Sequence, residues 1–308
     1  MREQRTRQEL KRAPRKWSRP DLAANAGAGE AFVANLSASL AQIGANAAGA
    51  AAGRDPEYLH QLRVGIRRLR SVLRTFRELL RRRGADAIDR QWRAIMHTLG
   101  SARDWDLFHR TLDGGELRRE ADQRRRETQR LARALVKSPR FRKVRSATFA
   151  WTRQRPWRRH ADARERLPRF ARQALDHLHA RLCKAAQGIN WRDAGRRHRV
   201  RIRVKRMRYA CDFFAAAFRP RRMRAFLDRL HSLQDLLGEL NDIQVQRVLM
   251  RGLARGSRPL RDPATPLAVR ARLEARERVL IAALEPAWTA FEARRPFWRH
   301  PEAARARG

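Results

Sequence analysis

Basic residues recur at helical spacing after a histidine near residue 60. They stand three or four residues apart, at His60, Arg63, Arg67, Arg70 and Arg74. Because an α-helix has 3.6 residues per turn, this spacing places the five side chains in one row along a helix. A guanidinium group stays charged at physiological pH and can donate two parallel hydrogen bonds to phosphate oxygens. The row therefore predicts a binding surface for a linear polyanion.

A second stretch repeats the pattern with a constant offset of 138 residues, since 198 − 60 = 138. Its row consists of His198, Arg201, Lys205 and Arg208. The same offset also pairs Arg68 with Arg206, Leu99-Gly100 with Leu237-Gly238, and Asp104 with Asp242. Two separate motifs in register at one offset indicate an internal repeat.

Neither row is accompanied by groups that predict catalysis. No close pair of His, Asp or Glu residues surrounds His60 or His198, so a metal site is not expected, and no cofactor is predicted. We expect both histidines to line the ligand site, with hydrogen-bonded packing as the alternative. Asp104 and Asp242 are interpreted as partners for arginines. A carboxylate beside guanidinium groups has a lowered pKa, which is unsuited to general acid catalysis.

An apolar row runs beside the first cationic row, one residue out of phase. Its members are Leu59, Leu62, Ile66, Leu69, Leu73 and Phe76. One residue corresponds to about 100° of helix rotation, so the cations border the buried face instead of lying opposite it. This arrangement predicts a basic cleft between packed helices. Arg68 and Arg206 lie a further 100° round, either at the rim of the cleft or in solvent.

The whole chain is predicted to be all-α, because no stretch shows the period-two alternation of a strand. Asp55-Pro56 is typical of a helix start and Gly84 of a helix end. A break is expected at Gly100, before a short helix that contains Phe108. The expected helices span about 22–49, 56–83, 86–99, 116–137, 139–153, 165–187, 193–218, 220–237, 239–252, 264–284 and 287–295.

Residues 1–21 are predicted to form a disordered basic tail. Residues 22–303 would then form one domain of two repeats, about 22–153 and 160–303, joined by a linker at 154–163. Two such repeats can face each other across a pseudo-two-fold axis, so that both cationic rows line a shared channel.

Composition points to polyanionic partners. Among 308 residues, 72 are Lys or Arg and 31 are Asp or Glu, which gives a formal charge of +41. Such a charge favours nucleic acid, polyphosphate or an anionic membrane surface. Two cysteines without a CxxC pattern predict neither a disulfide framework nor a thiolate metal site. We expect a soluble, cytoplasmic protein, because no membrane span or secretory signal is recognised. No feature predicts the oligomeric state.

The two rows lie in the segments HQLRVGIRRLR and HRVRIRVKRMR, and each is followed by a Leu-Gly…Asp element, LGSARD and LGELND. In these motifs, and over about residues 22–300, the chain resembles the CHAD domain family. The resemblance implies two antiparallel helical bundles around a basic central channel. It also implies polyphosphate binding by the eleven basic residues of the paired motifs and association with polyphosphate granules.

Two functions compete with polyphosphate binding: nucleic-acid binding and enzymatic processing of polyphosphate. Charge alone equally permits non-specific nucleic-acid binding, but no helix-turn-helix, zinc-finger or RNA-binding signature appears. A polyphosphate-processing enzyme would need a P-loop, a carboxylate cluster or the ExExK motif of the triphosphate-tunnel domains often fused to this family. None of these is found in the sequence, so the expectation is a stand-alone, non-enzymatic binding module.

Overall fold

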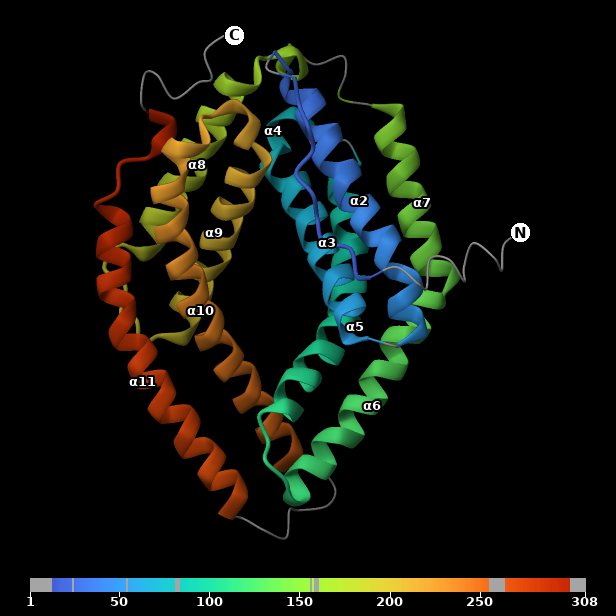
Figure 1. The fold of residues 1–308 in the computed structure, drawn as a ribbon, viewed down its shortest axis with the longest axis vertical. Coiled ribbons are helices and arrows are strands. Elements are labelled where there is room, and N and C mark those ends of the chain that lie inside the picture. Colours follow the sequence, from blue (N-terminus) through green and yellow to red (C-terminus); the bar gives the residue numbers. More distant parts are fainter. Residues whose placement is uncertain are drawn as a thin grey trace. The chain divides into compact units, whose positions relative to one another are not determined.

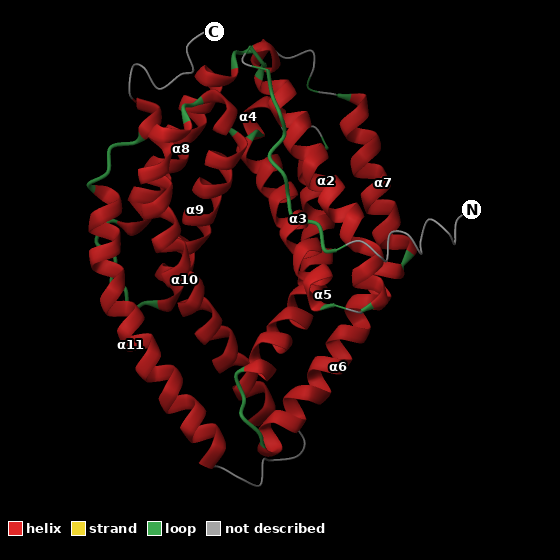
Figure 2. Cartoon of the chain, viewed as in Figure 1, coloured by secondary structure: helices red, strands yellow, loops and turns green. Residues whose placement is uncertain are grey.

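The computed structural model describes residues 13–23, 25–53, 55–80, 84–155, 157, 161–254 and 264–299. These residues form helices joined by loops, with no strand among them (Figures 1 and 2). The all-α prediction is therefore confirmed. The helices are α2 (Ala28–Ala52), α3 (Pro56–Thr75), α4 (Arg77–Leu80), α5 (Ala85–Arg110), α6 (Gly115–Lys137), α7 (Pro139–Gln154), α8 (Leu167–Ala186), α9 (Ala194–Phe213), α10 (Pro220–Ala254) and α11 (Ala264–Glu292). Three short 3₁₀ helices span Ala161–Arg164, Ala215–Ala217 and Phe297–Arg299.

Three predicted breaks are absent, because α5, α10 and α11 continue through Gly100, Gly238 and Pro286. A glycine inside a helix costs only about 1 kcal/mol relative to alanine. Packing of the flanking residues offsets that cost: Leu99 and Leu237 are buried. A proline removes one hydrogen bond at a cost of about 3 kcal/mol, which a long packed helix tolerates. None of the helices in the described part of the chain combines the length and the hydropathy that a bilayer crossing requires.

Helix α3 begins as predicted but ends earlier. The Asp55 carboxylate accepts a hydrogen bond of 2.7 Å from the backbone N–H of Glu57, which satisfies one open donor of the first turn. The helix ends at Thr75, and the next residue, Phe76, turns inward and packs edge-on against Phe32 of α2 at 5.5 Å. The expected glycine stop, Gly84, has a φ of 72° and lies beyond α4. All five members of the first cationic row, from His60 to Arg74, nevertheless lie within α3.

The described residues divide into two compact units. Unit 1 comprises Met1–Asp106 and Gln123–Leu167, and unit 2 comprises Leu107–Asp122 and Pro168–Gly308. Helices α5 and α6 pass from one unit into the other. Of the predicted linker 154–163, residues 156 and 158–160 lie outside the described residues. The pseudo-two-fold arrangement and the shared channel stay predictions.

Each unit buries the apolar row of its central helix. In unit 1, Leu62, Ile66 and Leu69 of α3 are fully buried against α2. In unit 2, Val200, Val204 and Met207 of α9 are fully buried in the same way. The position of the cations next to these rows therefore fixes them at the border of each core.

Residues 13–19, which fall within the predicted tail, make contacts with α2 and α3. The backbone N–H of Arg15 donates to the side-chain oxygen of Asn46, and the Asn46 amide donates back to the Arg15 carbonyl at 2.9 Å. The guanidinium of Arg68 stacks over the ring of Trp17 at 4.1 Å. A stacked cation and aromatic ring attract each other, so this segment lies against α2 and α3. Residues 1–12 lie outside the described residues.

Candidate functional site

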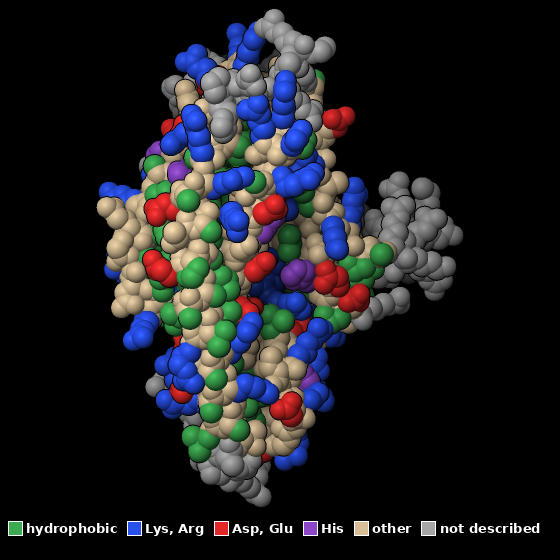
Figure 3. All heavy atoms as spheres, turned by 60° about the vertical axis from the view of Figure 1, so that its left-hand side comes forward, with side chains coloured by type: hydrophobic (Ala, Val, Ile, Leu, Met, Phe, Trp, Pro, Cys, Tyr) green, Lys and Arg blue, Asp and Glu red, His purple; other side chains and the backbone are tan. Residues whose placement is uncertain are grey.

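Charge alone does not locate a site on this protein. On the face shown in Figure 3, Lys and Arg side chains are spread over the whole height, with carboxylates scattered among them. Many surface arginines therefore reflect composition. A candidate site must instead show cations that are partly withdrawn from water and gathered by packing.

The α3 row in unit 1 meets that criterion near its N-terminal end. His60, Arg63 and Arg67 are half-buried, whereas cations on a solvated face would be exposed. Arg103 of α5 joins them, because its charge acts on His60. Burial is the main cause that lowers the pKa of His60, and the Arg103 charge lowers it further. Glu57 opposes this effect, while Arg67 and Arg63 add to it.

One donor atom of Arg63 has a neutral partner, and one donor atom of Arg67 has none among the described residues. A guanidinium nitrogen of Arg63 donates to the Gly100 carbonyl at 3.4 Å. The Nε atom of Arg67 is buried and has no hydrogen-bond partner among the described residues. A buried donor without a partner costs about 1–3 kcal/mol, which a bound anion would recover. A Cβ atom built on Gly100 would meet nothing within 4 Å, so the missing side chain leaves open space beside Arg63.

Arg70 and Arg74, in contrast, already hold a carboxylate. Nε of Arg70 donates to Asp89 at 2.7 Å, and a guanidinium nitrogen of Arg74 donates to the other Asp89 oxygen at 2.9 Å. Burial alone would raise the pKa of Asp89, but the bonds from the two arginines outweigh it and hold that pKa below its usual range. Two of the five members of the predicted row are therefore neutralised in part by α5.

The α9 row in unit 2 is divided in a similar way. His198 is exposed, and together with Arg201 it lines a pocket of about 250 Å³ whose other wall is α10. That wall consists of Leu237, Leu240, Asn241 and Gln244. Because Arg197 also lines it, the pocket has two guanidinium groups, one imidazole and two side-chain amides on its walls.

At the C-terminal end of the α9 row, Arg208 already has polar partners within the protein. Nε of Arg208 donates to the Gln234 side chain at 2.6 Å, and its Nη1 atom forms an ion pair with Asp212 at 3.3 Å. Asp212 stands where the first row has Arg74, so the substitution supplies an acid to Arg208 as well as ending the row. Lys205 is half-buried and has an interaction of its own.

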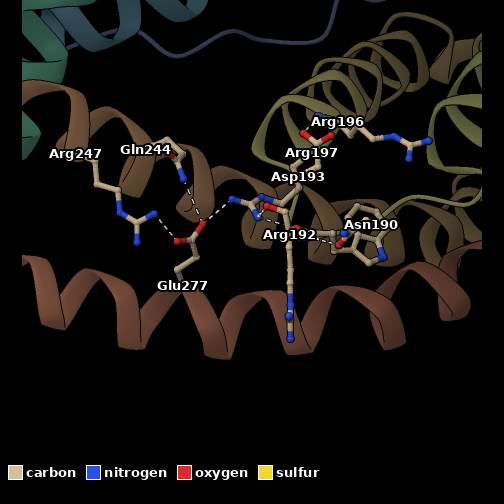
Figure 4. A network of polar contacts seen from close by, with 9 residues as sticks. Asn190, Arg192, Asp193, Arg196, Arg197, Gln244, Arg247 and Glu277 are labelled. Carbon is tan, nitrogen blue, oxygen red and sulfur yellow. Dashed lines mark hydrogen bonds and ion pairs between the residues drawn. The ribbon is translucent and has the colours of Figure 1, made fainter.

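A buried cation that the sequence pattern does not reveal supports the α9 pocket. Arg197 is 4% exposed, donates to the Trp191 carbonyl at 2.6 Å and forms an ion pair with Glu277 of α11, also at 2.6 Å. Gln244 and Arg247 contact the same carboxylate, as Figure 4 shows. Because Arg197 and Gln244 also line the pocket, this network fixes the relative position of α9, α10 and α11 there.

Arg68 and Arg206 lie away from the two rows. Arg68 is 9% exposed and stacks on Trp17, so it does not face solvent, which was one of its two expected positions. Arg206 lines a different pocket, between α8 and α9. The structure therefore brings nine of the eleven predicted residues into the two rows and separates these two from them.

The two aspartates of the Leu-Gly…Asp elements differ in environment. Asp104 is half-buried and has an interaction partner. Asp242 is exposed, and its carboxylate accepts a long bond of 3.5 Å from Asn241. Asp89 and Glu277 also hold arginines of α3 and α9, and neither belongs to a repeated motif. Arg103 is the one missed residue with a sequence signal, since it directly precedes Asp104 in LGSARD.

Comparisons with known proteins agree with this architecture. The sequence profile of the CHAD domain family matches residues 34–251. The crystal structure of the CHAD domain from the plant Ricinus communis aligns with a TM-score of 0.82 and 31% identity, over 92% of this chain and 98% of that chain. PptA from Streptomyces chartreusis shares the fold, with a TM-score of 0.61 and 18% identity over 86% of this chain and 97% of that chain. A search of curated protein sequences finds no match.

Proposed function

We propose, because the chain belongs to the CHAD domain family, that it binds inorganic polyphosphate without catalysing a reaction. The observation that carries this proposal is the half-buried group of His60, Arg63, Arg67 and Arg103 beside Gly100. Like charges gathered away from water repel each other, and a polyanion would relieve that repulsion. The pocket at His198 and Arg201 supplies a comparable group in unit 2.

A linear phosphate polymer suits these sites better than a rigid duplex. Successive cations on α3 stand about one helical turn, or about 5.4 Å, apart, so a flexible chain can touch them in series. Because they border the core, a ligand must approach closely between packed helices. We further propose that the protein acts in the cytoplasm and can associate there with polyphosphate granules.

Ligand-induced stabilisation tests the proposal. Long-chain polyphosphate at about 100 times its dissociation constant should stabilise the folded state by about 2.7 kcal/mol. For a chain of this size we expect the melting temperature to rise by about 4 °C. Sulfate should give a smaller rise. No rise with polyphosphate, or an equal rise with duplex DNA of matched charge, would contradict polyphosphate binding.

The proposal also predicts a pH dependence that originates at His60. In the free protein the lowered pKa means that protonation of His60 disfavours folding, so its contribution to stability falls as the pH drops below about 6.5. A bound polyanion favours the imidazolium form instead. We therefore expect the dissociation constant for polyphosphate to decrease between pH 7.5 and 5.5, by at most about tenfold per pH unit for one proton.

Binding measured at pH 7.5, 6.5 and 5.5 checks this expectation. His60→Gln should remove most of the pH dependence. His97→Gln provides the control, because His97 is an exposed histidine on α5. If both variants retain the wild-type profile, His60 does not contact the ligand.

A further inference from the structure

A second basic pocket lies wholly within unit 2, between α8 and α9. Its volume is about 560 Å³, and no carboxylate is among its lining residues. Two cations come from α8 and four from the outer side of α9: Arg181, Lys184, Arg196, Arg199, Arg203 and Arg206. The spacing of the α9 members, 3, 4 and 3 residues, aligns them along one face of that helix.

Contacts to the backbone position some of these cations without neutralising them. Arg196 donates to the Gly188 carbonyl at 3.3 Å, and Arg203 donates to the Arg199 carbonyl at 3.2 Å. Asp193, which caps α9, interacts with Arg196 and Arg199 at the N-terminal end of the pocket. The lining itself contains six cationic side chains and no acidic one, so the pocket is strongly basic.

The residues that lie 138 positions earlier, at the repeat offset, are mostly neutral, so these cations are specific to unit 2. The residues 138 positions earlier are Ile43, Asn46, Tyr58, Gln61, Gly65 and Arg68, in the same order as the six cations. Only the last of the six is basic. Five neutral positions of α2 and α3 therefore correspond to five cations that converge on one pocket in unit 2.

In unit 1, the space between α2 and α3 at these corresponding positions is also closed. A Cβ atom on Gly65 would approach Ile43 to 3.0 Å, and Gln61 accepts a hydrogen bond from Gln42 at 2.9 Å. The N-terminal segment covers the remainder, since Arg15 binds Asn46 and Trp17 lies over Arg68. In unit 2 the equivalents of Asn46 and Arg68, which are Lys184 and Arg206, line an open pocket.

From this contrast we infer that the α8–α9 pocket is a binding site for a compact anion that carries several phosphate groups. Its volume lies within the usual range for small-molecule sites, about 300–1,000 Å³. Arginine forks recognise phosphate oxygens in pairs. The apolar lining consists of Leu178 and Ala185, without an aromatic ring on which a nucleobase could stack. The site goes beyond the proposed function, because its α9 residues face away from the row of His198, Arg201 and Arg208.

Calorimetric titration of the full chain with inositol hexakisphosphate as the probe, at 150 mM salt, tests the inference. We expect saturable binding to the wild type and at least a tenfold weaker affinity for Arg199→Gln/Arg203→Gln. Arg90→Gln/Arg93→Gln removes two exposed cations from α5 and should leave the affinity unchanged. Arg63→Gln/Arg67→Gln should also bind normally, which separates this site from the polyphosphate rows.

A variant that fills the pocket distinguishes binding inside the pocket from attraction by the overall positive charge. Ala185→Phe leaves every charge in place but occupies the space between the helices, so it should reduce the affinity at least tenfold. Its far-ultraviolet circular dichroism should match the wild type, because Ala185 is only half-buried. Absence of binding to the wild type, equal weakening in the Arg90/Arg93 variant, or full binding by Ala185→Phe would each overturn the inference.

Discussion

Arg63→Glu/Arg201→Glu is expected to bind long-chain polyphosphate at least about 100-fold more weakly than the wild type at 150 mM salt. Hydrogen bonds between charged partners contribute about 1.5–3 kcal/mol each, so loss of one at each row amounts to about 3–6 kcal/mol. A change of 1.4 kcal/mol is a factor of ten in the dissociation constant. The new carboxylates add repulsion to this loss. Fluorescence anisotropy with end-labelled polyphosphate measures the effect.

The control for this variant reverses the same number of charges elsewhere. Arg90→Glu/Arg93→Glu changes two exposed cations on α5 that line neither row. It should reduce affinity only slightly, through the long-range field that salt screens. If the two variants weaken binding equally, the protein attracts polyphosphate through its overall charge and the rows have no special role.

Glu277→Ala is expected to lower the free energy of unfolding by about 3–5 kcal/mol, because it leaves the buried Arg197 guanidinium without its carboxylate. Removing both partners in Arg197→Met/Glu277→Ala should recover most of the loss, since no buried charge then remains. Urea unfolding followed by tryptophan fluorescence measures the three variants.

Glu274→Ala is the matched control on the same helix. Its partner Arg270 is 69% exposed, and exposed ion pairs contribute little to stability. We expect nearly wild-type unfolding for this variant. A mild effect of Glu277→Ala, or a double variant no more stable than the single one, would show that the network does not hold α9, α10 and α11 together.

Local sequence pattern was sufficient to predict that the chain is helical and that the cations of the two rows border the apolar core. The one-residue phase shift between Ile66 and Arg67 already places the first in the core and the second at its border. Helix ends were less predictable, since they depend on tertiary packing. Gly100 and Gly238 suggest breaks by propensity, yet buried neighbours carry both helices through them.

The electrostatic state of each cation could not be predicted from the sequence, because it depends on partners from other helices. Asp89 stands 19 residues from Arg70, and Glu277 stands 80 residues from Arg197. No periodicity links such pairs. The α8–α9 pocket was hidden for the same reason: Arg199 and Arg203 resemble background arginines until α8 brings Arg181 and Lys184 beside them.

Competition between polyanions tests the central claim most directly. Labelled long-chain polyphosphate is bound to the full chain at 150 mM salt and titrated with unlabelled polyphosphate, duplex DNA or single-stranded RNA at equal phosphate concentration. We expect polyphosphate to displace the label at concentrations at least tenfold below those needed with either nucleic acid, because a flexible phosphate chain without sugars and bases approaches cations at the border of the core most closely. Equal displacement by all three would contradict the claim.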